Sequence, residues 1–332
     1  MRWRPAVGLI LGAAVLAATL IYAGAGAVVR TLEGLHLTGL LFIALAHLPI
    51  VALMGLAWFL AAGTSQMAPA HRFMWARQVR DAAAETLPFS QIGGFVLGVR
   101  ALRVSGPAAL RGVLSMSVDL IVELGAKLPY VLAGGLTLFA LAPHSGLMRP
   151  LALGLLVTAA AVIAPMLARR RLGNAIERLI RRVSQRWPVL ASLRQLGLHG
   201  DINAVLDDIL RHRGRLASGL GLHVLCWFLG ALEVWLVFVL LGRPVSVPQA
   251  LVIDSVVAGL RTFVFMVPAA AGVQEASYVL ACAVFGIPPA AAVAASLARR
   301  ARDLALGAAT LAVAIGTDRA IIRGPRETSC RS

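Results

Sequence analysis

Five charged side chains stand in the last long apolar region of the sequence, and their types suit phosphate binding. Glu275 follows a break at 267–272, and a second break at 286–289 precedes Arg299, Arg300, Arg302 and Asp303. A charge near the centre of a membrane helix costs about 2.5–3.5 kcal/mol on insertion scales, so such residues are usually functional or buried against protein. Arg299 and Arg302 lie three residues apart on one helical face, and guanidinium groups bind phosphate in a bidentate manner.

Two interpretations of this region are open. In the first, Glu275 is a proton-coupled carboxylate or an ion-pair partner of one of the arginines at 299, 300 and 302, and backbone groups freed by the break face a lipid headgroup. In the second, the charges only neutralise one another and hold helices together. The first interpretation predicts a binding site formed by Pro268, Gly272, Gln274, Glu275, Arg299, Arg302 and Asp303.

Two earlier apolar segments carry further candidate binding residues. Asp119, Glu123 and Lys127 are spaced by four and form one stripe on a helix, with Glu123 and Lys127 in the favourable order for an ion pair. The stripe either lines a path for headgroups or protons, or is buried against another helix. His223 and Glu233 share a later apolar helix. We include Asp119, Glu123, His223 and Glu233 among the candidate binding residues.

The composition places most of this chain in lipid. Of its 332 residues, 59% are hydrophobic and 14% are charged, and the mean hydropathy is +0.83. These values exclude a water-soluble globular protein and predict an all-α polytopic integral membrane protein. The formal net charge of +16 comes mostly from basic residues between apolar segments, as the positive-inside rule describes, and no nucleic-acid binding is expected.

No cofactor is expected from the cysteines and histidines. The three cysteines are widely spaced without a CxxC motif, and the seven histidines include no HExxH pair or other metal-ligand spacing. The sequence also lacks a recognisable nucleophile or pair of acids at an interface. We therefore expect a protein without metal or cofactor that is not an enzyme.

The apolar segments predict six to eight transmembrane helices with interrupted or re-entrant segments. Residues 66–86 are typical of a cytoplasmic interfacial helix, residues 87–106 of a re-entrant or surface segment, and Pro129 is expected to divide residues 107–142. The chain is predicted to be a single membrane domain with both termini in the cytoplasm. Its parts are an N-terminal half (1–168), a basic cytoplasmic segment (169–215) and a C-terminal half (216–332).

The two halves share a weak internal similarity. Residues 87–126 can be laid on residues 267–306 at an offset of 180, which aligns Pro88 with Pro268 and Glu123 with Asp303. Identities are sparse, so chance similarity is the competing explanation. A true repeat would mark two related halves of a transporter. The halves would be inverted, with six crossings, if residues 249–286 form a re-entrant hairpin, and parallel, with eight crossings, if both arms span.

The C-terminal motif resembles a known family. Val267-Pro268 followed by Gly272-Val273-Gln274-Glu275, then Gly286, Ser296-Leu297 and Arg299-Arg300-Ala301-Arg302, is similar to the signature of the lysylphosphatidylglycerol-synthase transmembrane (flippase-like) family. His223, Trp227, Gly230 and Glu233 resemble most closely the branch found with hopanoid-biosynthesis genes. Ala269 and Ala270 stand where the family commonly has glycines, and Phe95 stands where an acidic residue is common. No aminoacyltransferase domain is recognised in this chain.

The resemblance implies lipid translocation rather than lysine transfer. The leading hypothesis is a multi-pass translocator of the bacterial inner membrane that moves a phospholipid, an isoprenoid-linked lipid or a hopanoid-type lipid. One alternative is a non-transporting assembly or regulatory factor that docks lipid-biosynthesis enzymes on the basic segment 169–215. A membrane enzyme of lipid modification is a weaker alternative. Membrane lipids are the expected partners, and the sequence leaves the oligomeric state open.

Overall fold

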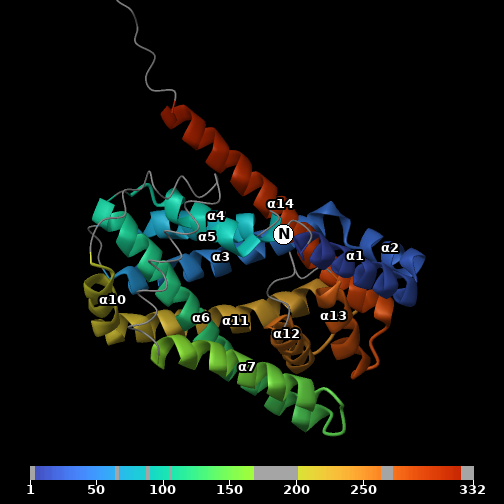
Figure 1. Ribbon diagram of the computed structural model, residues 1–332. Coiled ribbons are helices and arrows are strands. Elements are labelled where there is room, and N and C mark those ends of the chain that lie inside the picture. The colour runs from blue at the N-terminus through green and yellow to red at the C-terminus, as the bar shows by residue number, and fades with distance from the viewer. Residues whose placement is uncertain are drawn as a thin grey trace, which may run out of the picture.

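The computed structural model describes residues 4–63, 67–86, 90–104, 106–167, 201–262 and 272–322. Within these ranges the chain is helical and has no strand, which confirms the predicted all-α class (Figure 1). The helices are α1 (Arg4–Ala23), α2 (Ala25–Glu33), α3 (His36–Ala62), α4 (Ala70–Thr86), α5 (Ser90–Ala101), α6 (Gly106–Leu141), α7 (Met148–Leu167), α10 (Ile202–Arg211), α11 (Arg213–Leu240), α12 (Val247–Arg261), α13 (Val273–Ala283) and α14 (Pro289–Ile322).

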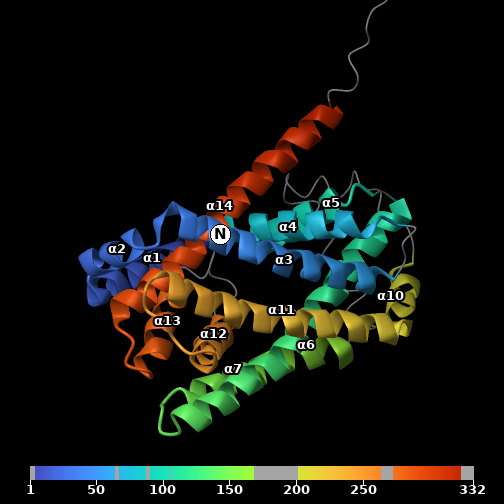
Figure 2. The ribbon, with the colours of Figure 1, turned by 180° about the vertical axis from the view of Figure 1, so that it is seen from behind.

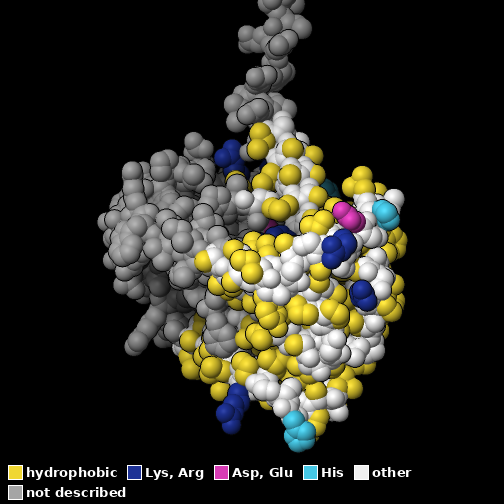
Figure 3. Space-filling view, turned by 90° about the vertical axis from the view of Figure 1, so that its right-hand side faces the viewer, with side chains coloured by type: hydrophobic (Ala, Val, Ile, Leu, Met, Phe, Trp, Pro, Cys, Tyr) yellow, Lys and Arg dark blue, Asp and Glu magenta, His cyan; other side chains and the backbone are white. Residues whose placement is uncertain are grey.

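Four helices of the described residues, α3, α6, α7 and α11, are long and apolar enough to cross a membrane. The bent pair α1 and α2 gives a fifth candidate. Large apolar side chains such as Leu156 and Leu167 are exposed on these helices, and the face in Figure 3 carries few charged side chains. Such a surface suits lipid tails rather than water. The predicted six to eight crossings include segments, such as the charged α14, that length and apolarity alone do not select.

Two helical hairpins are too short to cross the membrane. Helices α4 and α5 have 17 and 12 residues and pack against each other, and α12 and α13, with 15 and 11 residues, do the same. At 1.5 Å per residue these helices are about 17–26 Å long, less than the ~30 Å of a bilayer core. Their lengths agree with the interrupted segments expected at 87–106 and 249–286.

The structure differs from two expectations about single helices. Helix α4 packs against α3, α5 and α14 and has many buried residues, so residues 70–86 are not a surface helix. Arg77 and Arg80 can be buried because Asp119 and Glu123 of α6 neutralise them. Helix α6 also continues without a break through Pro129 and is not divided there. Its packing against α7, α11 and α12 compensates for the hydrogen bond that proline removes.

The order of helices repeats along the chain. Helix α3 begins at His36 and its counterpart α11 begins at Arg213, whereas α6 begins at Gly106 and its counterpart α14 begins at Pro289. The intermediate helices correspond as well, with α4 matching α12 and α5 matching α13. The shift in residue number from α6 to α14 is slightly larger than the shift from α3 to α11, because more residues lie between α12 and α13 than between α4 and α5. The helix bounds therefore support a repeat and extend it to α2 and α10, but at offsets of 177 (213 − 36) and 183 (289 − 106) instead of 180. The expected correspondence of Glu123 with Asp303 was wrong, because Glu123 falls on Leu306 when α6 is laid on α14.

The two halves run in opposite directions. Helices α3 and α11 pack side by side, with Arg215 bonded to the carbonyl of Gly63 at one end and Glu233 bonded to His47 toward the other. They are therefore antiparallel, as Figures 1 and 2 show. Because one hairpin follows the end of α3 and the other the end of α11, the hairpins approach from opposite sides. This geometry favours the inverted arrangement of the two expected from sequence.

Candidate functional site

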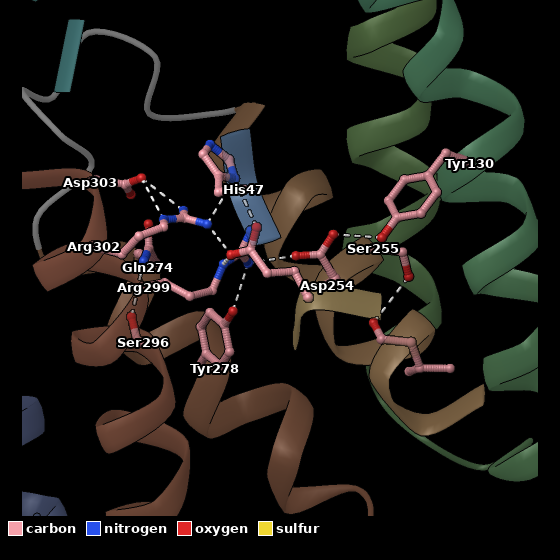
Figure 4. A network of polar contacts seen from close by, with 12 residues as sticks. His47, Tyr130, Asp254, Ser255, Gln274, Tyr278, Ser296, Arg299, Arg302 and Asp303 are labelled. Atoms are coloured by element: carbon pink, nitrogen blue, oxygen red, sulfur yellow. Dashed lines mark hydrogen bonds and ion pairs between the residues drawn. The ribbon is translucent and has the colours of Figure 1, made fainter. Parts of the chain in front are cut away.

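A first buried cluster of charges gathers around Arg302 of α14. The Arg302 guanidinium donates to Glu233 of α11 and lies 2.9 Å from Nδ1 of His47 on α3. It also donates two hydrogen bonds to Asp303, of 3.0 and 2.7 Å (Figure 4). The His47 Nδ1 is in turn 2.7 Å from the second Glu233 oxygen. Three helices from both halves therefore meet at one guanidinium, which is almost completely buried.

Arg299, one turn before Arg302, completes this cluster with a different acid. Its Nη1 donates to Oδ1 of Asp254 on α12 and to the hydroxyl of Tyr278 on α13, both at 2.7 Å. The Tyr130 hydroxyl of α6 donates to the other Asp254 oxygen at 2.6 Å. The Arg299 Nε, 3.6 Å from Glu233, has no hydrogen-bond partner. We call His47, Glu233, Asp254, Arg299, Arg302 and Asp303 the α14 cluster.

Glu275 does not belong to the α14 cluster. Its side chain is 0% exposed, and Oε2 accepts the backbone N–H of Gly272 at 2.8 Å, so that Glu275 caps the start of its own helix. Its other oxygen accepts from Arg300 at 3.0 Å and from Ser296 at 3.4 Å. Of the three expected partners, the structure selects Arg300.

The break that precedes Glu275 is described only in part. Gly272 adopts φ +79°, a conformation that favours glycine. The Gln274 amide donates to the Ser296 hydroxyl at 3.1 Å and so ties α13 to α14. Pro268, the remaining residue of the predicted site, lies outside the described residues. Residues 272 to 275 therefore have a clear structural role in joining α13 to α14.

A second cluster forms around Arg77 of α4 and contains the predicted acidic stripe of α6. The guanidinium binds both oxygens of Glu123 at 3.1 Å, donates to Asp81 at 2.8 Å and lies 3.5 Å from Asp119. Arg80 lies 3.2 Å from Asp81 and 3.6 Å from Glu123. We call this group, together with His223, the α4 cluster.

His223 of α11 joins the α4 cluster rather than the site that contains Glu233. Its Nε2 lies 3.0 Å from Oδ1 of Asp119. The imidazole is 0% exposed, and its Nδ1 has no hydrogen-bond partner. Ten residues separate His223 from Glu233, which is about 15 Å along a helix, so one helix supplies both clusters.

The expected ion pair between Glu123 and Lys127 is not formed. Glu123 faces α4 and its arginines, whereas the Lys127 ammonium donates to the Thr262 hydroxyl at 2.5 Å and lies 5.7 Å from the Trp227 ring centroid. Two guanidinium groups on a neighbouring helix compete successfully with one flexible ammonium because they can bind the carboxylate in a bidentate manner.

The two clusters occupy equivalent places in the two halves and carry exchanged charges. When α3 is laid on α11, Arg77 of α4 corresponds to Asp254 of α12. When α6 is laid on α14, Asp119 corresponds to Arg302. Each cluster also includes a histidine from the long helix of the other half, His47 of α3 or His223 of α11. These two histidines fall within one position of each other when α3 is laid on α11.

Several cluster residues were not predicted from the sequence. Arg77, Arg80 and Asp81 were assigned to a surface helix, and His47, Asp254 and the two tyrosines were not selected. The signal for Asp254 was present, since an acid within an apolar helix needs a partner. The signal for His47 was weaker, because a lone histidine in a span is equally compatible with simple packing.

A separate apolar cavity is present, and none of the residues that line it belongs to either cluster. It has a volume of about 620 Å³ and is formed by one side each of α6, α7, α10 and α11. Leu114, Ile121, Val162 and Leu220 are typical of its lining. Among the described residues, no group of three or more His, Cys, Asp or Glu side chains could hold a metal ion. The site therefore offers charged hydrogen-bonding groups and an apolar cavity.

Comparison with known proteins identifies the family. The family model described as lysylphosphatidylglycerol synthase TM region matches residues 6–310, which include both clusters and the cavity. No curated protein and no solved structure matches the chain. The family match does not separate branches, so the hopanoid-associated branch remains a prediction. The chain is a membrane protein that belongs to the family of the lysylphosphatidylglycerol synthase transmembrane region.

Proposed function

We propose that the protein is a flippase-like translocator that moves a lipid across the bacterial inner membrane. The observation that carries this proposal is the pair of oppositely directed short hairpins, each of which contributes to a buried charged cluster within the bundle. Inverted halves with interrupted helices at the binding site are the architecture of many carriers. Buried charges of this kind are expensive in a membrane, which supports a functional role.

The α14 cluster is suited to bind a lipid phosphate by exchange. In the described state Arg302 donates to two carboxylates, and Nη1 of Arg299 donates to a carboxylate and a tyrosine, whereas Nε of Arg299 has no hydrogen-bond partner. A phosphate group could take over these same bidentate contacts, because it presents several acceptor oxygens to the planar guanidinium. Binding would therefore require a carboxylate such as Glu233 to release Arg302. We expect a lipid with an anionic phosphate or pyrophosphate headgroup.

The apolar cavity provides a separate place for hydrocarbon, since its lining residue Leu220 precedes Glu233 by 13 residues, or about 20 Å along α11. Its volume of about 620 Å³ is within the range of ligand pockets, and its walls are almost entirely apolar. An apolar cavity between membrane helices is favourable for a chain or ring system and unfavourable for water. Phospholipid, isoprenoid-linked and hopanoid-type lipids all satisfy this requirement, so the headgroup must decide among them.

The distribution of arginines supports the proposed orientation. Arg100, Arg111, Arg213 and Arg215 lie near the ends where α3 finishes and α11 begins, whereas the opposite end has few basic residues among the described ranges. By the positive-inside rule the arginine-rich end is cytoplasmic. The α4–α5 hairpin would then enter from the cytoplasm and the α12–α13 hairpin from the periplasm.

Reconstitution into liposomes tests the proposal and separates it from its alternatives. Purified protein is supplied with fluorescent phospholipid, isoprenoid phosphate and hopanoid probes in turn, and movement between leaflets is followed by membrane-impermeant quenching. We expect translocation of at least one probe. Failure with every probe class would contradict the proposal, and chemical conversion of a probe would instead indicate an enzyme. Retained binding of lipid-biosynthesis enzymes without translocation would indicate an assembly factor.

A further inference from the structure

The two clusters contain the same numbers of arginines, carboxylates and histidines, although the charges at equivalent positions are opposite. Each contains two arginines, three carboxylates and one histidine. With both histidines neutral, each cluster has one carboxylate more than it has arginines. Lys127, bonded to Thr262, can offset only one of these two negative charges. An excess negative charge favours the protonated form of a neighbouring group, and the partly exposed Asp81 and Asp303, with 29% and 25% exposed side chains, carry that excess at the edge of each cluster.

The contacts of His47 identify a place for that proton in the α14 cluster. Its Nδ1 lies 2.9 Å from a nitrogen of Arg302 and 2.7 Å from an oxygen of Glu233. Arginine can only donate hydrogen bonds. If Nδ1 of His47 accepts from Arg302, Nδ1 carries no proton. The proton of the contact between His47 and Glu233 must then be on Glu233. If Nδ1 carries the proton instead, it donates to Glu233. Both arrangements place one exchangeable proton between His47 and Glu233.

The two histidines differ in how exposed their side chains are. His47 is 22% exposed and borders a cavity of about 30 Å³, whose other polar walls are Gln78, Asp81, Glu85 and Asp303. A cavity of this size has room for about two water molecules. His223, its counterpart in the other half, is 0% exposed and has an unpartnered Nδ1. Related sites with unequal access are expected for a carrier with inverted halves held in one state.

We propose that the pairs His47–Glu233 and His223–Asp119 are two proton-binding sites, alternately open to water, that couple lipid movement to proton movement. In the described state a hydronium ion in the cavity gives its proton to His47 and becomes water. Starting from a neutral His47 and an ionised Glu233, the pair then becomes neutral overall and holds Arg302 less strongly, which frees the guanidinium for a lipid phosphate. The coupling step rests on the proposed translocation, whereas proton binding does not.

Charged groups on every neighbouring helix contribute to the behaviour of the two sites. The charged neighbours of His47 come from three helices. They are Glu233 of α11, Asp81 and Glu85 of α4, and Arg299, Arg302 and Asp303 of α14. The neighbours of His223 are Asp119 and Glu123 of α6, with Arg77 and Arg80 of α4 bound to these acids. Asp254 of α12 lies near Gly230, two turns further along α11.

Histidine NMR of the full-length protein tests proton binding without any transport assay. The ¹⁵N signals are assigned by their loss in His47→Gln and His223→Gln, with the exposed loop residue His144 removed as a control. We expect the His47 signal to show that its imidazole gains a proton as the pH is lowered. Because Glu233→Gln removes the anion that stabilises the imidazolium, it should lower the proton affinity of His47 at least about tenfold. A His47 that keeps one protonation state over the whole pH range in which the protein stays folded, or ignores Glu233→Gln, would overturn the proposal.

Liposomes with an imposed pH gradient then test coupling. The gradient should accelerate lipid movement by the wild-type protein and by His144→Gln, and His47→Gln should abolish that acceleration. A titrating His47 with gradient-independent translocation would overturn the coupling while leaving the translocator proposal intact. Absence of translocation in all proteins would instead contradict the proposed function. If His47→Gln does not purify as a monodisperse protein, Glu233→Gln replaces it in the same comparison.

Discussion

Arg77 and Asp254 hold equivalent positions in the two inverted halves and carry opposite charges. Each is buried on the first helix of a short hairpin, and each binds groups on the long helix that packs across it. Arg77 binds Glu123 of α6, and Asp254 binds Arg299 of α14. Because the signs are exchanged on both the hairpin and the long helix, each half keeps an ion pair between these two elements.

The Asp254–Arg299 pair should be strongly coupled. Removing one partner leaves a buried charge without compensation, which typically costs about 3–5 kcal/mol. We expect Asp254→Asn and Arg299→Gln each to lower the thermal stability of the purified protein markedly, and the double variant to recover part of the loss. The exposed residue Arg149 provides the control substitution, Arg149→Gln. Additive losses in the double variant would contradict the pairing.

Glu275 should couple to Arg300 and not to Arg302. Glu275→Gln and Arg300→Gln remove the same contact, so their effects on unfolding free energy should fall short of additivity by about 0.5–3 kcal/mol. Glu275→Gln and Arg302→Gln touch different partners and should be additive within about 0.5 kcal/mol. Chemical or thermal unfolding of the single and double variants in one detergent measures both sums. A larger coupling for Arg302 than for Arg300 would disprove this assignment.

Sequence spacing located the charges of α14 but not their partners. Helical periodicity shows that Arg299 and Arg302 share a face, yet the acids they bind lie 45 and 69 residues away on other helices. The same limitation explains Lys127, whose four-residue spacing from Glu123 suggested a local pair. Pairing across helices depends on the packing of the halves, and a spacing rule within one helix contains no information about it.

The class of fold was much easier to predict than the position of its charged helices. High hydropathy required an all-helical membrane bundle, and the interrupted segments marked both hairpins. The arginines of α4 were misleading, because a helix rich in charge normally lies at the surface. Here Arg77 is buried because Asp119 and Glu123 face it, and those acids were themselves predicted as site residues. A buried acidic stripe needs cations on a neighbouring helix, and Arg77 and Arg80 of α4 supply them.

Adjacent glycines of α5 provide a test of the first hairpin. A Cβ on Gly94 would come within 2.5 Å of the Arg80 carbonyl oxygen, whereas a Cβ on Gly93 would meet nothing within 4 Å. Gly94→Ala should therefore destabilise the protein by about 1–3 kcal/mol through overpacking. Gly93→Ala should be neutral or stabilising, because alanine is the better helix former. Equal thermal shifts in the two variants would show that α5 does not pack on α4 in this way.

Attachment of α10 to α6 should weaken in acid. A hydrogen bond from Arg111 holds the pKa of the Asp208 carboxyl below its ordinary value. Such a group stabilises the folded state above its unfolded-state pKa and loses this effect as the pH falls through the lower folded value. We expect hydrogen exchange in α10 to increase below about pH 4 in the wild type. Asp208→Asn should show the faster exchange already at neutral pH, with little further change in acid.

Filling the apolar cavity should impair lipid movement without unfolding the protein. Ser117→Phe places a ring in the space between α6, α7 and α11, and Val157→Phe adds the same ring to the exposed side of α7. We expect Ser117→Phe to slow translocation about tenfold, which corresponds to ~1.4 kcal/mol, and Val157→Phe to have little effect. Unchanged translocation by Ser117→Phe would show that the cavity does not receive the lipid.

The most direct measurement is the rate at which a fluorescent anionic phospholipid, or another probe found to be moved, crosses the bilayer of proteoliposomes. The account predicts that the wild-type protein and Arg149→Gln move the probe faster than protein-free liposomes. It also predicts that folded, monodisperse Arg302→Gln loses at least about nine-tenths of that rate. A wild-type rate equal to that of protein-free liposomes, or an Arg302→Gln rate equal to the wild type, would contradict the account.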